Sequence, residues 1–385
     1  MTDSIRYVGV NDHDVDLFEG QYVVPNGMAY NSYVILDEKV AILDTVDHHK
    51  CAEYLENLEA ALAGRKPDYL VIHHIEPDHA SSVQAVVERW PEVKLVGGPK
   101  TFPLLAQYFP GLDFSSALTV KEGDQLSLGS HVLHFISAPM VHWPEVMMSY
   151  ESTEKILFSA DAFGKFGALD AEEDWDCEAR RYYFNIVGKY GTQVQTVLKK
   201  AAGLDITTIC PLHGPVLTET IPHVLDLYRI WSSYGVESEG VFIAYASLHG
   251  NTAAAAEQLA DLLRSKGCPK VTVADLARCD MAEALEDAFR YGKIVLAAAT
   301  YNAGIMPFME DFLHHLKAKN YQKRTVGLME NGSWAPFAVK GMTDILSTMK
   351  EITILPETVT LRGPMKESDL PVMEALASAL VCSFE

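Results

Sequence analysis

Five continuous apolar runs, separated by segments of helical pattern, constrain the fold of the second half of this 385-residue chain. The apolar runs are 241–246, 271–274, 294–297, 325–328 and 352–355, and helices are expected near 252–265, 280–290, 307–318, 335–349 and 366–381. Strands that are apolar along their whole length and alternate with helices are typical of a parallel sheet covered on both faces. We therefore expect a doubly wound α/β domain with a five-stranded parallel sheet, which binds its ligand beyond the carboxyl ends of the strands.

Loops at three of these strand ends carry residues suited to a ligand with an anionic group and a flat ring. The candidate binding residues are Ser247, Leu248, His249, Gly250, Asn251, Thr252, Thr300, Tyr301, Asn302, Ala303, Gly304, Glu330, Asn331, Gly332, Ser333 and Trp334. The first loop leads into a helix, whose N-terminal N–H groups and dipole bind anions. It lacks the Gly-Lys-Ser/Thr ending of a nucleoside triphosphate loop, which a monophosphate does not need. We expect Tyr301 and Trp334 to flank the ring.

The first half of the chain carries a dense group of metal-ligand residues, His-Ile-Glu-Pro-Asp-His at 74–79. The group follows the apolar run 69–72, which predicts a buried strand. His142, Asp161 and His213 each follow another apolar run, so four strand ends are expected to meet at one edge. Imidazole and carboxylate ligands without thiolate suit first-row divalent metals, and four donors in six residues exceed the needs of one open tetrahedral site. The set favours two adjacent metal ions.

Shorter strands and flanking helices are expected around this motif, and they end at a polar, glycine-bounded segment, 235–240. A hairpin pattern covers 21–44 with a turn at 25–27, short strands dominate 118–158, and helical patterns cover 51–62, 82–90, 178–200 and 222–234. The first half is therefore expected to be α+β. We place the domain boundary in the polar segment, which gives domains of residues 1–238 and 239–385.

Composition limits the partners and the location of the chain. The net charge is −21 and no basic patch is interleaved with aromatic residues, so nucleic acid and anionic membranes are poor partners. The first residues lack a signal pattern and no apolar run is long enough to span a bilayer, so we expect a cytoplasmic protein. The six cysteines form no Cys-x-x-Cys pair, which argues against a disulfide framework or a zinc ribbon.

The ligand spacing in the first half resembles the metallo-β-lactamase superfamily, whose hydrolases usually carry His-x-His-x-Asp-His, with Glu76 in place of the second His. Together with the flavodoxin-like second half and the stretches 29–33 and 43–45, this pattern resembles the flavodiiron proteins over nearly the whole chain. The resemblance implies a metallo-β-lactamase-like αββα sandwich followed by a flavodoxin-like domain that binds FMN. The usual Ser-Pro-Thr of flavodoxins is Ala-Ala-Thr at 298–300 here, a departure from the family pattern beside the expected flavin ring.

The same resemblance implies two non-haem iron ions joined by an oxo or hydroxo bridge. It assigns His74, Glu76 and His142 to one iron, Asp78, His79 and His213 to the other, and Asp161 to a bridging position. It also implies reduction of O2 to water or of NO to nitrous oxide, with electrons delivered through FMN in a head-to-tail homodimer or a dimer of dimers. We expect an external electron donor, with a rubredoxin as the first hypothesis and a flavin reductase or a deazaflavin coenzyme as alternatives.

Glu76 and the completeness of the ligand set separate this hypothesis from two others. Two ferrous ions carry four positive charges, which three carboxylates and one bridging hydroxide neutralise in a low-dielectric pocket. A zinc-dependent hydrolase fused to a flavodoxin-like module is the first alternative, and Glu76 argues against it. An electron carrier with a degenerate metal domain is the second, and the seven-residue set argues against it. The sequence does not choose between O2 and NO.

The other histidines are not expected to bind the iron ions. His73 is expected to support the ligands, His131 and His134 to pack on a strand, and His48, His49, His314 and His315 to lie on helix surfaces. A contact between His249 and the flavin or its phosphate is left open.

Overall fold

The computed structural model describes residues 2–382. The chain divides into two compact units, and the division along the sequence lies between Arg229 and Ile230. This point lies inside helix α7 (Ile221–Ser232), whereas residues 238 and 239 begin strand β16 (Ser238–Ala246). The domain boundary between residues 238 and 239 stays a prediction. Each unit has its own sheets and its own hydrophobic core.

The first unit contains two sheets that pack face to face. The strands of one sheet are β1 (Ile5–Tyr7), β6 (Tyr33–Leu36), β7 (Val40–Leu43), β8 (Tyr69–Val71), β9 (Lys94–Gly97) and β10 (Leu118–Thr119), in that order. Those of the other are β11 (Gln125–Ser127), β12 (Val132–Ser137), β13 (Met147–Glu151), β14 (Ile156–Phe158) and β15 (Thr208–Cys210). Both sheets contribute to one cluster of buried side chains, including Ile35 and Val71 from the first and Phe135 and Phe158 from the second.

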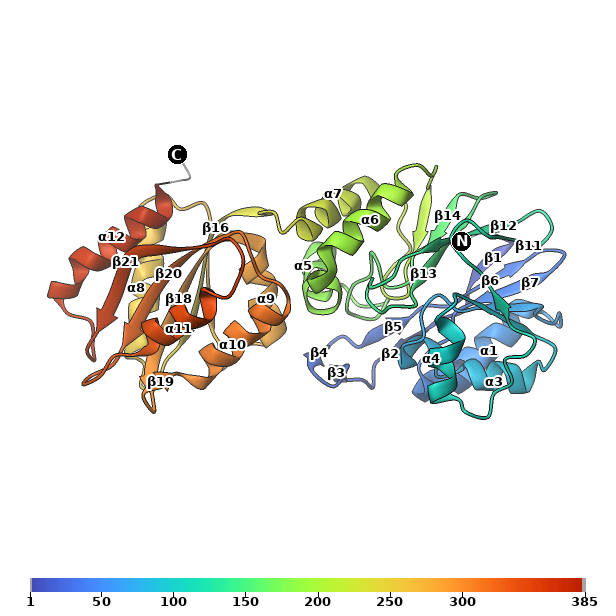
Figure 1. Cartoon of the computed structure of the whole chain (residues 1–385), viewed down its shortest axis with the longest axis horizontal. Helices are drawn as coiled ribbons and strands as arrows, with labels where there is room; N and C mark the ends of the chain where they lie inside the picture. The colour runs from blue at the N-terminus through green and yellow to red at the C-terminus, as the bar shows by residue number, and fades with distance from the viewer. Residues whose placement is uncertain (1, 383–385) are drawn as a thin grey trace. The chain divides into compact units, whose positions relative to one another are not determined.

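Helices cover the outer faces of this sandwich. The helices of this part of the chain are α1 (Cys51–Leu62), α2 (Pro77–Ala80), α3 (Val83–Arg89), α4 (Thr101–Tyr108), α5 (Trp175–Tyr182), α6 (Gly191–Ala201) and α7, of which the short α2 lies at the end of β8. In Figure 1, α1 and α3 lie beside the first sheet and α6 and α7 lie beside the second. The predicted αββα arrangement is therefore confirmed.

Two local predictions in the first unit need adjustment. The run 21–24 does not pair with β6, because β4 (Tyr22–Val23) pairs with β3 (Leu17–Phe18) and β5 (Met28–Tyr30) pairs with β2 (Val10–Asp12). A Cβ at Gly27 would lie 2.2 Å from the carbonyl oxygen of Asp12, so this turn passes too close to β2 for any other residue. The helical stretch 178–200 is divided by a π-helical turn, Tyr183–Val187, and by a 3-10 turn, Gly188–Tyr190.

The second unit is a parallel sheet in the order β17-β16-β18-β20-β21, with the additional strand β19 paired to β18. Its strands after β16 are β17 (Val271–Asp275), β18 (Tyr291–Tyr301), β19 (Gly304–Ile305), β20 (Arg324–Asn331) and β21 (Ile352–Leu361). Its helices are α8 (Asn251–Ser265), α9 (Met281–Arg290), α10 (Pro307–Ala318), α11 (Ala338–Leu346) and α12 (Leu370–Val381). The predicted doubly wound, five-stranded sheet is confirmed.

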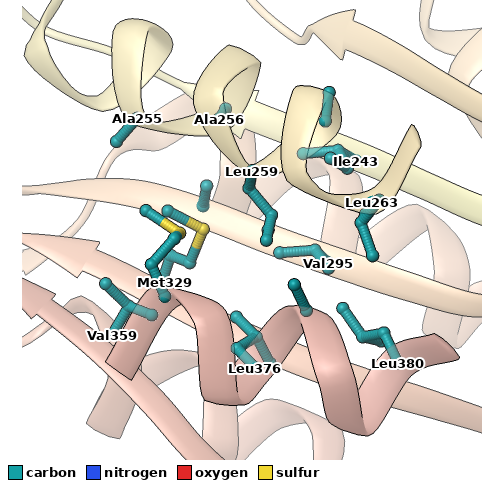
Figure 2. Packing of buried hydrophobic residues seen from close by; sticks show 14 of the residues in the cluster. Ile243, Ala255, Ala256, Leu259, Leu263, Val295, Met329, Val359, Leu376 and Leu380 are labelled. Atoms are coloured by element: carbon teal, nitrogen blue, oxygen red, sulfur yellow. The ribbon is translucent and has the colours of Figure 1, made fainter. Parts of the chain in front are cut away.

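The core of the second unit fixes the helix that leads out of the first candidate binding loop. Ala255, Ala256, Leu259 and Leu263 form a helical stripe on α8 and are fully buried. Figure 2 shows this stripe packing over Val295 in the sheet and toward Leu376 and Leu380 of α12. Burying a leucine side chain stabilises a fold by roughly 1.5 to 3 kcal/mol, so the position of α8 is well determined.

Among the residues that the structure describes, no helix has both the length and the apolar character needed to cross a bilayer.

Candidate functional site

Loops from both sheets of the first unit bring together all seven side chains that the sequence predicts as metal ligands. His74, Glu76, Asp78 and His79 follow β8 in the first sheet, while His142, Asp161 and His213 follow β12, β14 and β15 in the second. Pro77 begins the short helix α2, a position that proline favours, and α2 carries Asp78 and His79. The apolar strands are anchored in the core, and the polar residues beyond their ends converge.

His74, Glu76, His142 and Asp161 form what we call the first donor group. The Nε2 atom of His74 lies 3.2 Å from Glu76 Oε2 and 3.3 Å from Asp161 Oδ2. The Nε2 atom of His142 lies 3.0 Å and 3.2 Å from the same two oxygens. Two imidazoles and two carboxylates therefore face one common point.

Asp78, His79 and His213 form the second donor group. The Nε2 atoms of His79 and His213 are 3.0 Å apart, and they lie 3.1 Å and 3.2 Å from Asp78 Oδ2. Asp161 faces this group as well, because its Oδ1 atom lies 3.2 Å from His79 Nε2. One oxygen of Asp161 thus faces each donor group.

The donor separations fit metal ions. A metal about 2.1 Å from each donor leaves neighbouring donors about 3 to 3.4 Å apart in tetrahedral or octahedral geometry, close to the distances observed in both groups. Both oxygens of Asp78 and of Asp161 are buried and have no hydrogen-bond donor within the described part of the chain. Buried carboxylates are costly unless a cation or a donor compensates them. The side chains present therefore fit two metal ions that share Asp161.

The electrostatics of the groups also favour positive charge at the imidazoles. Burial lowers the pKa of His79, but Asp78 and Asp161 outweigh it and raise the pKa to about 10. Burial likewise lowers the pKa of His142, while Asp161 and Glu76 raise it to about 9. Burial raises the pKa of Asp161, yet the surrounding histidines hold it well below its usual range. The carboxylates therefore attract protons or cations to this cavity.

Hydrogen-bond acceptors fix which ring nitrogen of His74 and of His213 faces its donor group. His74 donates from Nδ1 to Glu145 Oε1 at 2.7 Å, and His213 donates from Nδ1 to the carbonyl oxygen of Ala29 at 2.8 Å. A carboxylate and a carbonyl only accept, so both rings carry their proton on Nδ1. Their Nε2 lone pairs are left for a metal.

A series of buried hydrogen bonds through His73 supports the loop after β8. His73 Nδ1 lies 2.5 Å from Asp44 Oδ2, and His73 Nε2 lies 2.8 Å from Ser149 Oγ. The other oxygen of Asp44 accepts from the backbone N–H of His73 at 2.7 Å. His73 lies outside both donor groups, as the sequence predicts.

Sequence reasoning missed Asp44 and Glu145. Both are carboxylates beside motif residues, and Asp44 directly follows β7 with a left-handed φ of 57°. A carboxylate at the end of an apolar strand was a usable signal for Asp44. Nothing in the sequence near Glu145 indicates that it contacts His74, because that contact depends on how two loops pack.

Aromatic rings enclose the donor groups. The Trp143 ring lies edge-on to His74 with centroids 5.4 Å apart, and Phe18 lies edge-on to His213 at 5.3 Å. The Tyr182 ring lies 5.5 Å from His213, immediately before the π-helical turn. These rings limit the access of water to the centre.

A cavity of about 290 Å³ lies at the carboxyl ends of the strands in the second unit. Its lining residues are Leu248, His249, Asn251, Thr252, Ala299, Thr300, Asn302, Ala303, Asn331, Gly332, Ser333, Trp334, Ala335 and Gly363. None of these described residues is acidic, although the chain has a net charge of −21. The N-terminus of α8 begins at Asn251 in this lining. The cavity therefore suits an anionic ligand, and a phosphate group in particular.

Five residues predicted for this site do not line the cavity: Ser247, Gly250, Tyr301, Gly304 and Glu330. The Oγ atom of Ser247 accepts from the N–H of Gly250, whose φ of 85° favours glycine. Glu330 is buried, and its carboxylate accepts from the N–H of Val339 at 2.9 Å and from Thr360 Oγ1 at 3.0 Å. Ser247, Gly250 and Glu330 thus support the binding loops from behind.

The second of these loops is a tight hairpin. Strand β18 continues beyond its predicted end to Tyr301 and reverses through Asn302 and Ala303, whose φ angles are 47° and 57°. Two consecutive left-handed residues are typical of a type I′ turn. Asn302 and Ala303 line the cavity, while Tyr301 does not, so Trp334 is the one Phe, Tyr or Trp residue among the described lining residues.

Comparisons with known proteins match both units. The family described as ODP family beta lactamase matches residues 28–214, and the family described as Flavodoxin domain matches residues 242–352. A nitric oxide reductase from Moorella thermoacetica is 29% identical over 381 residues, which cover 96% of this chain and 94% of the relative.

Solved structures agree with these matches. Rubredoxin oxygen:oxidoreductase from Desulfovibrio gigas is similar with a TM-score of 0.92 and 26% identity, covering 100% of this chain and 97% of that chain. The flavodiiron protein from Giardia intestinalis is similar with a TM-score of 0.91 and 25% identity, covering 99% and 94%.

Proposed function

Because this chain belongs to the flavodiiron protein family, we propose that it reduces O2 to water or NO to nitrous oxide at two iron ions, with electrons delivered through FMN. The observation that carries the proposal is the position of Asp161, whose two oxygens face two separate donor groups. A zinc hydrolase with a single metal has no need of such a shared carboxylate.

The residues assigned to the iron ions are the seven of the two donor groups. His74, Glu76 and His142 would hold one iron, Asp78, His79 and His213 the other, and Asp161 would bridge them. When bound, the iron pair supplies open coordination positions for a diatomic gas, and FMN supplies electrons. Glu145 and the carbonyl of Ala29 hold the His74 and His213 rings with Nε2 toward the metals. Trp143 and Phe18 keep bulk water from the centre.

The cavity of the second unit is assigned to FMN. The N–H groups at the start of α8, with the Thr252 hydroxyl, would bind the phosphate, and the absence of acidic side chains from the described lining supports this. Trp334 would cover one face of the isoalloxazine ring. Thr300 lines the cavity, and its Oγ1 accepts from the N–H groups of Phe337 and Ala338 at the start of α11. These bonds hold α11 beside the cavity.

A head-to-tail homodimer, or a dimer of such dimers, would bring the FMN of one chain to the irons of its partner. Exposed apolar side chains support this assembly in both units. Leu17 and Val23 are 42% and 43% exposed on the β3–β4 hairpin, next to Phe18. Trp334 is 85% exposed and Leu248 is 44% exposed at the flavin cavity. Full activity from a verified monomer would count against this assembly.

Electrons would come from a separate protein or coenzyme. The name of the Desulfovibrio gigas relative includes rubredoxin, so we take rubredoxin as the first donor to test. A flavin reductase and a deazaflavin coenzyme are the alternatives. The cytoplasmic location also stays a prediction.

The test begins with metal and flavin content, followed by anaerobic reduction and separate exposure to O2 and NO. We expect two irons and one FMN per chain and a reduced flavin that at least one gas reoxidises. Zinc in place of iron, with a flavin that neither gas reoxidises, would contradict the proposal and favour a hydrolase.

A matched pair of variants tests the shared carboxylate. Asp161→Asn should retain FMN and lose iron from both donor groups. Asp205→Asn removes an exposed carboxylate that pairs with Lys155 and belongs to neither donor group, and it should retain iron and activity. Normal iron content in Asp161→Asn would refute the bridging role.

A further inference from the structure

A second cavity, of about 260 Å³, lies in the first unit at the ends of strands from both of its sheets. Four segments line it: residues 98–100 after β9, 120–121 after β10, 135–139 at the end of β12, and 144–147, which lead into β13. None of these described lining residues belongs to a donor group or to the cavity assigned to FMN. We call this cavity the edge cavity.

Most of the wall of the edge cavity is apolar. Phe135, Ile136, Val146 and Met147 are buried, and Val120 packs against the hydrophobic core of the first unit. A cavity of roughly 150 Å³ can hold one benzene molecule, so the edge cavity has room for one substituted ring. The wall therefore suits a small molecule with an apolar, ring-sized body.

Glu145 supplies a buried acceptor in this wall. It is the one acidic residue among the described lining residues, and its side chain is fully buried. Its Oε1 accepts from His74 Nδ1 at 2.7 Å and from the N–H of Ile75 at 3.1 Å. Its Oε2 is also buried, and no donor within residues 2–382 reaches it. A buried carboxylate oxygen without a donor is costly, so a ligand that donates a hydrogen bond to Oε2 would gain binding energy.

The solvent side of the edge cavity is positively charged. Lys100 and Lys121 both line the cavity and are exposed. Glu122, beside Lys121, pairs with Lys200 instead, with Oε2 and Nζ 2.8 Å apart. In the described part of the chain neither Lys100 nor Lys121 forms an ion pair with a carboxylate. Two such lysines in a chain of net charge −21 favour an anionic group at this side.

We propose that the edge cavity binds a small aromatic acid that also carries a hydroxyl or N–H group, and that this ligand weakens iron binding in the first donor group. The acid group faces Lys100 and Lys121, the ring lies against the apolar wall, and the hydroxyl or N–H group donates to Glu145 Oε2. The effect on iron rests on the proposed function, whereas the binding site does not.

Two connections link the edge cavity to the first donor group. Pro139 and Pro144 line the cavity, and His142 lies between them in the loop from β12 to β13. Glu145 contacts His74 with one oxygen, so a donor on its other oxygen withdraws charge from that contact. Loss of such a partner costs roughly 10- to 100-fold in metal affinity, and sharing it should cost less, roughly 2- to 10-fold. The coupling is reciprocal, so metal-free protein should bind the ligand more tightly by the same factor.

The binding test titrates the full-length protein, loaded with iron and FMN, with 4-hydroxybenzoate, which carries a carboxylate, one ring and a hydroxyl donor. Calorimetry should show one equivalent per chain. Benzoate should bind at least about tenfold more weakly, because it leaves Glu145 Oε2 without a donor. Equal binding of the two probes would overturn the role of Glu145, and absence of saturable 4-hydroxybenzoate binding would overturn the site.

Variants of the lining place the probe. Lys100→Ala/Lys121→Ala should weaken binding of 4-hydroxybenzoate roughly 2- to 30-fold and leave binding of the neutral 4-hydroxybenzamide unchanged. The matched control, Lys66→Ala/Lys94→Ala, removes two lysines outside the lining and should bind both probes normally. Val120→Trp fills the cavity and should abolish binding of both. Unchanged binding of 4-hydroxybenzoate in either lining variant would overturn the site, and the lysine pair decides this if Val120→Trp does not fold.

The coupling test measures iron affinity by competition with a chelator, with and without saturating 4-hydroxybenzoate. We expect roughly 2- to 10-fold weaker iron binding with this probe and no change with benzoate at the same concentration, which also controls for iron bound by the carboxylate of the probe. Probe binding without a change in iron affinity would overturn the coupling. Absence of iron from the purified, unmodified protein would instead refute the proposed function, and the same titration of the FMN-loaded protein would then decide the binding site alone.

Discussion

Replacing Glu145 by glutamine should weaken iron binding without disturbing the shape of the site. Glu145 is fully buried, and its Oε1 accepts from His74 Nδ1 at 2.7 Å and from the N–H of Ile75 at 3.1 Å. Glutamine is isosteric and its oxygen still accepts both bonds. The substitution therefore removes the negative charge and leaves the tautomer of His74 in place.

The size of the effect follows from these two bonds. Hydrogen bonds to a charged group contribute about 1.5 to 3 kcal/mol and neutral ones about 0.5 to 1.5 kcal/mol. Loss of the charge should cost about 1 to 2 kcal/mol, which corresponds to roughly 5- to 30-fold weaker iron binding. This range overlaps the roughly 10- to 100-fold effect typical of groups that orient metal ligands.

Competition with a chelator measures this change on the folded protein. The matched control is Glu151→Gln, since Glu151 is equally buried and accepts from backbone N–H groups but contacts none of the seven ligands. Glu151→Gln should lose stability and keep its iron affinity. Equal iron affinity in Glu145→Gln and the unmodified protein would refute the view that the Glu145 charge strengthens His74 as a ligand.

Three further predictions concern other parts of the chain. Glu76→His should retain the fold and FMN but lose most reductase activity, because it removes one of three carboxylates that balance the metal charge; turnover with O2 and NO measures it. His131→Gln should destabilise the protein mainly at low pH. Burial lowers the pKa of His131, but Glu154 and Asp37 outweigh it, so the pKa is higher in the folded protein than in the unfolded chain. The charged His131 should therefore stabilise the fold by about 1 to 3 kcal/mol below about pH 6.5, and this contribution is lost as the pH rises through the pKa of the folded protein. Urea unfolding at pH 5.5 and pH 9 measures the change in unfolding free energy. Leu259→Ala should cost about 2 to 5 kcal/mol of unfolding free energy, measured by urea unfolding, because Leu259 is fully buried between α8 and the sheet.

A contradicting result or a matched control tests each of these predictions. Full activity in Glu76→His would undercut the charge argument. An equal loss of stability for His131→Gln at both pH values would be inconsistent with a charged pair. Leu262→Ala, on the partly exposed side of α8, should cost less than Leu259→Ala.

The sequence predicted the second unit closely, because each strand is a continuous apolar run between helices. It missed the end of β18, since Ala299 and Thr300 carry no stop signal and the hairpin turn uses Ala303 in a left-handed conformation. The unexpected pairing of β4 with β3 has a similar origin, because register between short strands depends on packing rather than on local pattern.

The candidate ligands were predictable because each lies shortly after an apolar strand. The carboxylates that hydrogen-bond the histidines of this site were harder to predict. Glu145 is 71 residues from His74 along the chain, and Asp44 is 29 residues from His73, so these contacts exist only once the loops have packed. Five of the predicted flavin residues support the loops from behind or point elsewhere, which sequence spacing cannot distinguish from lining the cavity.

The ligands come from both sheets of the first unit, and this arrangement has a mechanical consequence. In each donor group, residues that follow β8 face residues that follow strands of the other sheet. A metal bound in either group would therefore cross-link the two sheets and close long loops, such as the one from His79 to His213, much as a disulfide does. Opening of the sandwich would require release of both ions, so the loaded protein should resist proteolysis and unfold far more slowly than the metal-free protein.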